Sequence, residues 1–110
     1  MLSLKETVSL IGLQPETGIG IAVAEGVYSA HGVPLVLTSV TDGKHRAVDT
    51  LHPKGYAFDC RLPSKYSTHG TINTDVFRSL QIELGPEWDV VLEVDHIHVE
   101  YDPKPKETIT

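Results

Sequence analysis

Cysteines, basic side chains and long apolar runs are all scarce in this chain of 110 residues. Cys60 is the only cysteine, so no disulfide can form within the chain, and folding must rely on core packing, with or without a bound metal. Nine Lys and Arg residues stand against 15 Asp and Glu residues, and no stretch gathers basic side chains into a phosphate-binding surface. Nucleic acid is therefore not an expected partner.

The apolar runs are too short for a membrane span. The N-terminal stretch MLSLKETVSLIGL is interrupted at Lys5, Glu6 and Thr7, and no run approaches the roughly 18 apolar residues that a spanning helix needs. We therefore expect no signal peptide and no membrane span, and synthesis in the cytoplasm. The length predicts a single domain over 1–110. Its last residues, about 103–110, hold two prolines in a polar stretch and are expected to fray.

Local patterns predict two helices. The stretch 15–32 begins at Pro15, which suits a first helical turn, and ends at Gly32 in a C-cap position. A second amphipathic helix is expected between an N-cap at Asn73 or Thr74 and a C-cap at Gly85.

Strands are predicted at two further places. The β-branched stretch 34–40 is typical of a buried strand, and 88–101 is rich in strand formers and becomes alternately apolar and ionisable in its second half. Together with the two helices, these strands predict an α+β fold, in which a small antiparallel sheet is flanked by helices.

The candidate chemistry lies in a few of the six histidines and in one aspartate. His52 precedes a predicted strand that carries Asp59, while His96 and His98 share one face of another strand. If these strands pair, His52, Asp59 and His98 can converge. Two neutral imidazoles and one carboxylate, with a fourth position left to water, form the ligand set of a catalytic zinc site. Gly55 would allow the sharp turn between His52 and the strand.

Two motifs resemble those of a known family, the zinc D-alanyl-D-alanine carboxypeptidases and endolysin peptidases, which share their core with the hedgehog signalling domain. The first motif is carried by Thr50, His52, Gly55, Ala57 and Asp59, and the second is DHIHVEY, 95–101. The resemblance covers about 35–101. Thr50 stands where Ser is commoner, and we expect no cell-wall-binding module within these 110 residues.

The resemblance implies a hedgehog/D-Ala-D-Ala-peptidase-like fold in which His52, Asp59 and His98 bind Zn²⁺ and Asp95 serves as general base. The family also places a basic or amide side chain in the loop before the first motif. Lys44 and Arg46 are therefore the candidates for polarising the scissile carbonyl and stabilising the oxyanion.

The activity that this implies is zinc-dependent cleavage of peptidoglycan stem peptides, by a D-Ala-D-Ala carboxypeptidase or an L-Ala-D-Glu type endopeptidase. A phage or bacterial lytic enzyme that reaches the cell wall after release would fit this activity. Arg61, Lys65 and Arg78 are candidates for docking a substrate carboxylate.

Several assignments within this site stay open. On a regular strand Asp95 and His98 point to opposite faces, so Asp95 reaches the site only if the chain bends around 94–96. His96 is on the metal face and could contact the water or the transition state, or replace His98 as ligand; the motif favours His98. Glu93 is a weaker base candidate, and Glu100 is expected to orient a ligand.

Two other functions use the same residues. A zinc-containing binding module that does no hydrolysis is the first alternative. The second is a non-haem iron oxygenase, which also uses two His and one carboxylate. The seven-residue separation of His52 and Asp59 is longer than such iron sites usually show.

Overall fold

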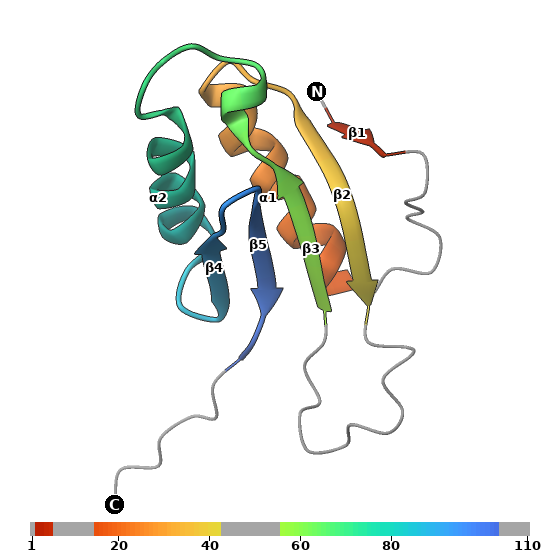
Figure 1. The fold of residues 1–110 in the computed structure, drawn as a ribbon. Coiled ribbons are helices and arrows are strands. Elements are labelled where there is room, and N and C mark those ends of the chain that lie inside the picture. Colours follow the sequence, from red (N-terminus) through yellow and green to blue (C-terminus); the bar gives the residue numbers. More distant parts are fainter. Residues whose placement is uncertain (1, 6–14, 43–55, 104–110) are drawn as a thin grey trace, which may run out of the picture.

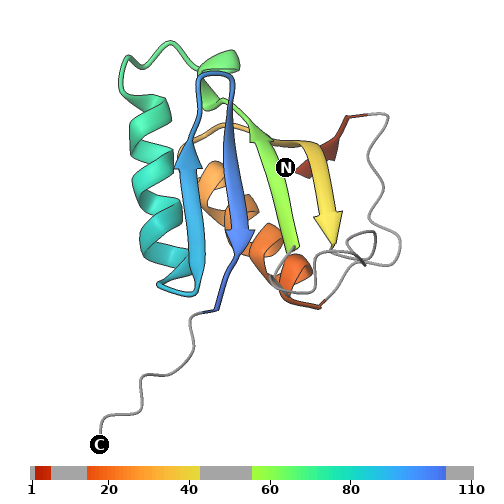
Figure 2. The same cartoon turned by 60° about the horizontal axis from the view of Figure 1, so that its bottom comes forward.

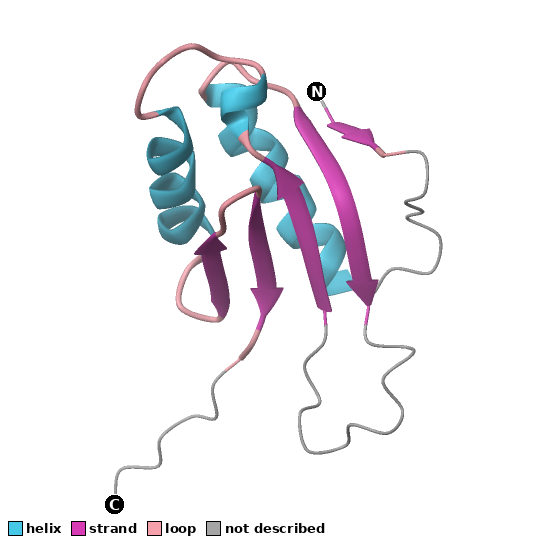
Figure 3. Cartoon of the chain, viewed as in Figure 1, coloured by secondary structure: helices cyan, strands magenta, loops and turns pink. Residues whose placement is uncertain are grey.

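The structure is a computed structural model that describes residues 2–5, 15–42 and 56–103. It contains five strands in one mixed sheet, two α-helices and a short 3-10 helix, so the predicted α+β class is confirmed (Figures 1 and 3). The elements in chain order are β1 (Leu2–Leu4), α1 (Pro15–Ala30), β2 (Leu35–Asp42), β3 (Tyr56–Arg61), η1 (Pro63–Lys65), α2 (Ile72–Leu84), β4 (Trp88–Leu92) and β5 (His96–Tyr101).

The sheet has the strand order β1-β2-β3-β5-β4. Three of its four pairings are antiparallel, as predicted, but β1 runs parallel to β2, so the sheet is mixed and the wholly antiparallel prediction is wrong. The physical reason is the connection: two parallel neighbours need a crossover segment, and α1 lies in the segment that joins β1 to β2. Strand β1 has only three residues, and the sequence analysis did not predict it.

Both helices cover the same face of the sheet (Figure 2). Helix α1 packs against β2 and β3, and α2 packs against α1 and β4. Their apolar residues form the core together with one face of the strands, and the largest fully buried side chains include Tyr28, Phe58, Leu80 and Ile97. Neither of these helices has the length and apolar composition needed to cross a membrane.

Helix α1 ends with a Schellman motif at the predicted glycine. Gly32 has φ 74°, its N–H donates to Ser29 O at 2.9 Å, and the N–H of Val33 donates to Tyr28 O at 3.1 Å. Glycine adopts this left-handed conformation without a steric cost, and the Val33 side chain that follows it is buried in the core. The C-cap prediction is confirmed, and the chain is turned directly into β2.

Helix α2 begins earlier than predicted. Its N-cap is Thr71, not Asn73 or Thr74. Asn73 is used elsewhere: its Oδ1 accepts from the Ser64 backbone N–H at 2.9 Å, and its Nδ2 donates to Ser64 Oγ at 3.1 Å. A long-range partner therefore outweighs the local capping preference. The C-cap at Gly85, with φ 86°, is confirmed.

The stretch 88–101 folds into a hairpin of two strands, β4 and β5, joined through 93–95. The N–H of Glu93 donates to His96 O at 2.8 Å across this turn. The alternation predicted for β5 is confirmed, since Ile97 and Val99 are fully buried while His96 and His98 are partly exposed. The predicted frayed tail lies outside the described residues, apart from Pro103.

Candidate metal centre

The ionisable side chains predicted from β3 and β5 lie on the sheet face away from the helices. In the antiparallel pairing, Asp59 lies opposite His98, and Arg61 lies opposite His96. Side chains along a strand alternate between faces, so Asp59 and the two histidines share one face, while Phe58, Cys60 and Ile97 point into the core. Within the described residues, no helix covers the polar face (Figures 1 and 2).

Asp59, His96 and His98 form one cluster on this face. Each offers a ligand atom, and these atoms all lie within 4.8 Å of one another. His98 Nδ1 lies 2.8 Å from Asp59 Oδ1, and His96 Nε2 lies 3.7 Å from the same oxygen. The side chains are 24–32% exposed, which leaves the cluster open to small molecules from solvent.

The cluster fits a divalent metal ion in geometry and in chemistry. With zinc bonds of about 2.0–2.1 Å in a tetrahedral arrangement, neighbouring ligand atoms lie about 3.3 Å apart. The two distances from Asp59 Oδ1, 2.8 and 3.7 Å, lie on either side of that value, so each differs from the tetrahedral separation by only about half an ångström. Two imidazoles and a carboxylate suit Zn²⁺ and other first-row divalent metals.

Each imidazole is also held by a second carboxylate. His98 Nε2 lies 3.0 Å from Glu100 Oε1, and His96 Nδ1 lies 2.6 Å from Asp95 Oδ1. Each ring therefore directs one nitrogen towards Asp59 and the other towards an outer carboxylate. This is the arrangement by which proteins orient metal-binding histidines and raise their basicity. Glu100 makes the contact expected for a residue that orients a ligand.

Hydrogen bonds between the imidazoles and the carboxylates shift two pKa values, those of His98 and Asp95. Partial burial disfavours a charge on His98, but its hydrogen bonds to Glu100 and Asp59 outweigh burial, and the pKa of His98 lies above its ordinary value. The hydrogen bond from His96 lowers the pKa of the exposed Asp95 carboxyl. A site that favours a protonated imidazole also offers negative charge to a cation.

The bend required to bring Asp95 to this site is present. The turn over 93–95 leaves Asp95 79% exposed, with its carboxylate against the ring of His96. Asp95 therefore contacts the cluster through His96. Its predicted role as general base stays a prediction.

Several predicted site residues lie outside the described residues. These are His52, the first predicted zinc ligand, the motif residues Thr50 and Gly55, and the two candidates for polarising the carbonyl, Lys44 and Arg46. Asp59 and His98 from the predicted ligand set are brought together, and His96 joins them, whereas the sequence had suggested His96 as a ligand only in place of His98. Sequence reasoning missed Tyr66, whose hydroxyl contacts Arg61, because that contact depends on the conformation of η1.

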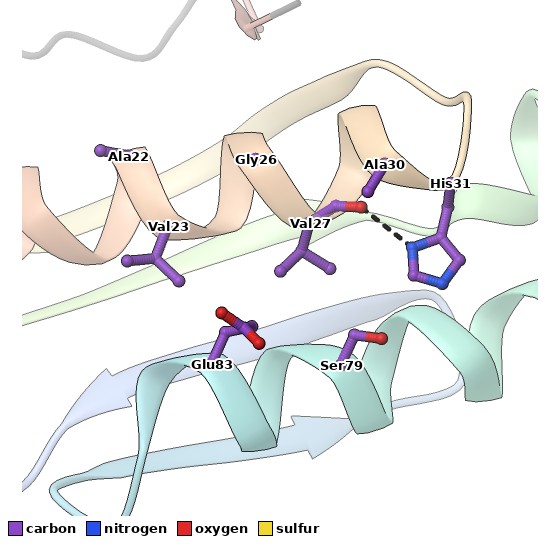
Figure 4. A pocket seen from close by; sticks show the side chains of 8 residues that line it. All are labelled: Ala22, Val23, Gly26, Val27, Ala30, His31, Ser79 and Glu83. Atoms are coloured by element: carbon purple, nitrogen blue, oxygen red, sulfur yellow. Dashed lines mark hydrogen bonds between the residues drawn. The ribbon is translucent and has the colours of Figure 1, made fainter.

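Two other groupings lie away from the cluster, one polar and one largely apolar. His69, Thr71 and Asp75 bond to one another at the start of α2. A hollow of about 410 Å³ between α1 and α2 is lined by small and apolar residues of α1, including Val23 and Gly26, and by Ser79 and Glu83 of α2 (Figure 4). His31, at its end, bonds through Nδ1 to Val27 O at 2.9 Å and so caps the helix. Neither grouping offers the converging ligand set of the β3–β5 face.

Comparison of the chain with protein-family models, with curated proteins and with solved structures finds no match.

Proposed function

We propose that this chain is a zinc-dependent peptidase that cleaves peptidoglycan stem peptides. The supporting observation is the cluster of Asp59, His96 and His98, in which each imidazole faces Asp59 on one side and an outer carboxylate on the other. The resemblance of the two motifs to the carboxypeptidase and endolysin family supplies the reaction type. Access to the wall after release from the cytoplasm belongs to the same proposal.

Asp59 and His98 would hold the metal together with a second imidazole as the third protein ligand. The resemblance favours His52 for this place, and the 3.7 Å separation of His96 Nε2 from Asp59 Oδ1 favours His96. Bound there, zinc would act as a Lewis acid on the scissile carbonyl and lower the pKa of a coordinated water. Glu100 would keep the His98 ring oriented through the hydrogen bond to Nε2.

The side chains around the cluster would handle the protons and the developing charge. Asp95 would accept a proton from the attacking water and return it to the leaving amine. Lys44 or Arg46 would donate hydrogen bonds to the oxyanion as it forms. His96, hydrogen bonded to Asp95, would hold that carboxylate at the edge of the site, if it is not itself a ligand.

The test is digestion of muropeptides by purified, zinc-loaded protein, with the products identified by mass spectrometry. Wild type is expected to release a terminal D-Ala or to cut an internal stem bond, and Asp95→Asn is expected to retain zinc but lose turnover. Asp75→Asn is the matched control, because Asp75 also pairs with a histidine, His69, but at the start of α2. If Asp95→Asn cleaves as fast as Asp75→Asn, the assignment of the base is wrong.

A zinc-containing binding module is the second candidate. It is favoured by the exposed position of Asp95, whose carboxylate is already engaged by His96. Folded protein that carries zinc but cleaves no peptidoglycan type would support this candidate over the peptidase. Metal analysis of the purified protein separates both from an iron oxygenase, which would carry iron.

A further inference from the structure

Arg61 lies next to the candidate metal cluster. It is the last residue of β3, two positions after Asp59 on the same face, and its cross-strand partner in β5 is His96. The other two basic residues considered for docking a carboxylate are placed differently. Arg78 is exposed on α2, on the helical side of the sheet, and Lys65 is exposed at the end of η1.

Arg61 is held at both ends of its length. Its backbone carbonyl accepts a hydrogen bond at 3.0 Å from the hydroxyl of Tyr28, a residue buried in the core. At the other end, its Nη1 donates to the hydroxyl of Tyr66 at 3.0 Å. Tyr66 follows η1, whose Pro63 is buried, so the chain folds back at a fixed point and returns the tyrosine to the arginine.

This support makes the guanidinium a pre-positioned donor. Arginine has five N–H donors in a planar fork that matches a carboxylate, and the bond to Tyr66 uses one of them. Fixing the side chain in advance reduces the entropy lost when an anion binds. Beside a site that would polarise a carbonyl, such a group selects for a carboxylate at a defined distance from that carbonyl.

The distance can be compared with peptide geometry. The Cα atoms of two residues that are two positions apart on a strand, such as Asp59 and Arg61, are separated by about 6.6–6.8 Å. In a substrate whose residue after the scissile bond has a free α-carboxylate, the scissile carbonyl carbon and the carboxylate carbon are three bonds apart, at most about 4 Å. The carboxylate C–O bond of about 1.2 Å and a hydrogen bond of about 2.9 Å bring the distance from the carbonyl carbon to the guanidinium nitrogen to at most about 8 Å. A carbonyl at the Asp59 end of the face would therefore place the carboxylate at Arg61.

We propose that Arg61, positioned by Tyr66, binds the free α-carboxylate of the residue that follows the scissile bond. The inference rests on the proposed peptidase function and names its substrate class. A terminal D-Ala has this carboxylate, and so does a D-Glu whose chain continues through its side-chain carboxyl. The same contact would therefore favour cleavage of both the D-Ala-D-Ala bond and the L-Ala-D-Glu bond. It would disfavour ordinary internal peptide bonds, because there the carboxyl group of the following residue is part of an amide.

The first test measures turnover. The stem peptide that wild type cleaves is compared with its analogue in which this carboxylate is an amide. We expect Arg61→Gln to reduce the preference for the acid over the amide by about tenfold to a hundredfold, mainly through a higher KM for the acid. Arg61→Lys should restore part of the preference, Tyr66→Phe should lose part of it, and Arg78→Gln should keep it. An acid-to-amide ratio that is the same in wild type and Arg61→Gln would overturn the proposal.

The second test measures binding without turnover. N-acetyl-D-alanine, which has a carbonyl three bonds from a free carboxylate, and its amide are titrated into zinc-free protein and followed by the NMR signal of the Arg61 side chain. We expect a shift with the acid that is absent with the amide and lost in Arg61→Gln. Equal shifts with acid and amide would contradict the carboxylate site. A selective shift in a protein that cleaves no peptide would leave this site standing and overturn the peptidase.

Discussion

Three carboxylates surround two imidazoles at the candidate centre. Asp59 lies between the rings, and Asp95 and Glu100 lie on their outer sides. With both imidazoles neutral, the group has a formal charge of −3, within a chain whose formal charge is −6. Such a concentration of negative charge is stabilised by protons on the imidazoles or by a divalent cation between them. The arrangement thus favours cation binding before any particular metal is considered.

Glu100 offers a test of the outer carboxylates. Glu100→Gln keeps the size of the side chain and removes its charge, so the His98 ring loses the charged partner of its Nε2. We expect zinc affinity to fall about 10- to 100-fold, the usual effect of losing an outer-shell partner, while the fold is retained. Titration against a chromophoric chelator measures this affinity, and far-UV circular dichroism checks the fold.

The control for this change is Glu83→Gln, which removes the same charge from α2 on the helical side of the sheet. It should leave zinc affinity unchanged. Equal losses in the two variants would mean that Glu100 acts only through the net charge of the chain, and the orienting role would be wrong.

For single residues, the sequence predicts which side chains lie close together where regular strand geometry determines their positions. The two-residue period and the assumption that two strands pair were enough to place Asp59 beside His98. Contacts that depend on irregular segments were not predictable in the same way. The bond between Asp95 and His96 depends on the turn at 93–95, and the bond between Arg61 and Tyr66 depends on η1.

Helix α1 and strand β4 meet at a close contact between a glycine and a tryptophan. A Cβ added at Gly20 would overlap the ring of Trp88, with Cζ3 only 2.7 Å away. Trp88 also packs against Phe58 and Tyr101, with ring centroids 6.4 and 5.0 Å apart, so its ring cannot move without disturbing these neighbours. The absence of a side chain at residue 20 therefore determines how closely α1 approaches the sheet.

Gly20→Ala is expected to destabilise the protein by about 1–3 kcal/mol, the usual cost of overpacking a core. Gly18→Ala is the matched control on the same helix, because a Cβ there meets no atom within 4 Å. Alanine is the better helix former, so Gly18→Ala should raise stability by up to about 1 kcal/mol. Urea unfolding of both variants measures the difference; a Gly20→Ala variant as stable as Gly18→Ala would show that the contact with Trp88 relaxes freely.

The helix ends that were predicted correctly are those marked by a proline or a glycine. Pro15 and Gly32 mark the ends of α1, and Gly85 marks the end of α2. The N-cap of α2 was wrong because Asn73 bonds to Ser64 from the preceding segment. The parallel β1 was missed because three residues carry too little periodicity, and parallel pairing is set by the crossover rather than by the strand itself.

The stability of the whole domain should fall at alkaline pH because of two buried acids in its core. Burial raises the pKa of both the Tyr28 hydroxyl and the Cys60 thiol. Below their ordinary pKa values, about 10 and 8.5, both groups are protonated whether the chain is folded or not. At higher pH the unfolded chain releases these protons and the native protein keeps them, so the stabilisation is lost progressively as pH rises.

The free energy of unfolding is therefore expected to decrease from about pH 8.5 upward. Urea titrations between pH 7 and pH 11 measure it. In Cys60→Ala the decrease should be shallower and should begin nearer pH 10, with lower stability at every pH because a core side chain is smaller. An unchanged slope would show that other groups cause the alkaline loss.

A bound metal would connect the central strand of the sheet, β3, to its neighbour β5 through Asp59, His96 and His98. A ligand that binds only the folded protein stabilises it by about 2.7 kcal/mol when its free concentration is 100 times Kd. For a domain of this size we expect zinc to raise Tm by roughly 10–20 °C, and a chelator to reverse the change. Calorimetry with and without zinc measures this change in Tm.

The control compares two variants: Asp59→Asn should lose most of the increase in Tm, whereas His69→Gln, at the start of α2, should keep it. An increase of equal size in both variants would place the metal elsewhere on the chain and remove the support for a centre on this face.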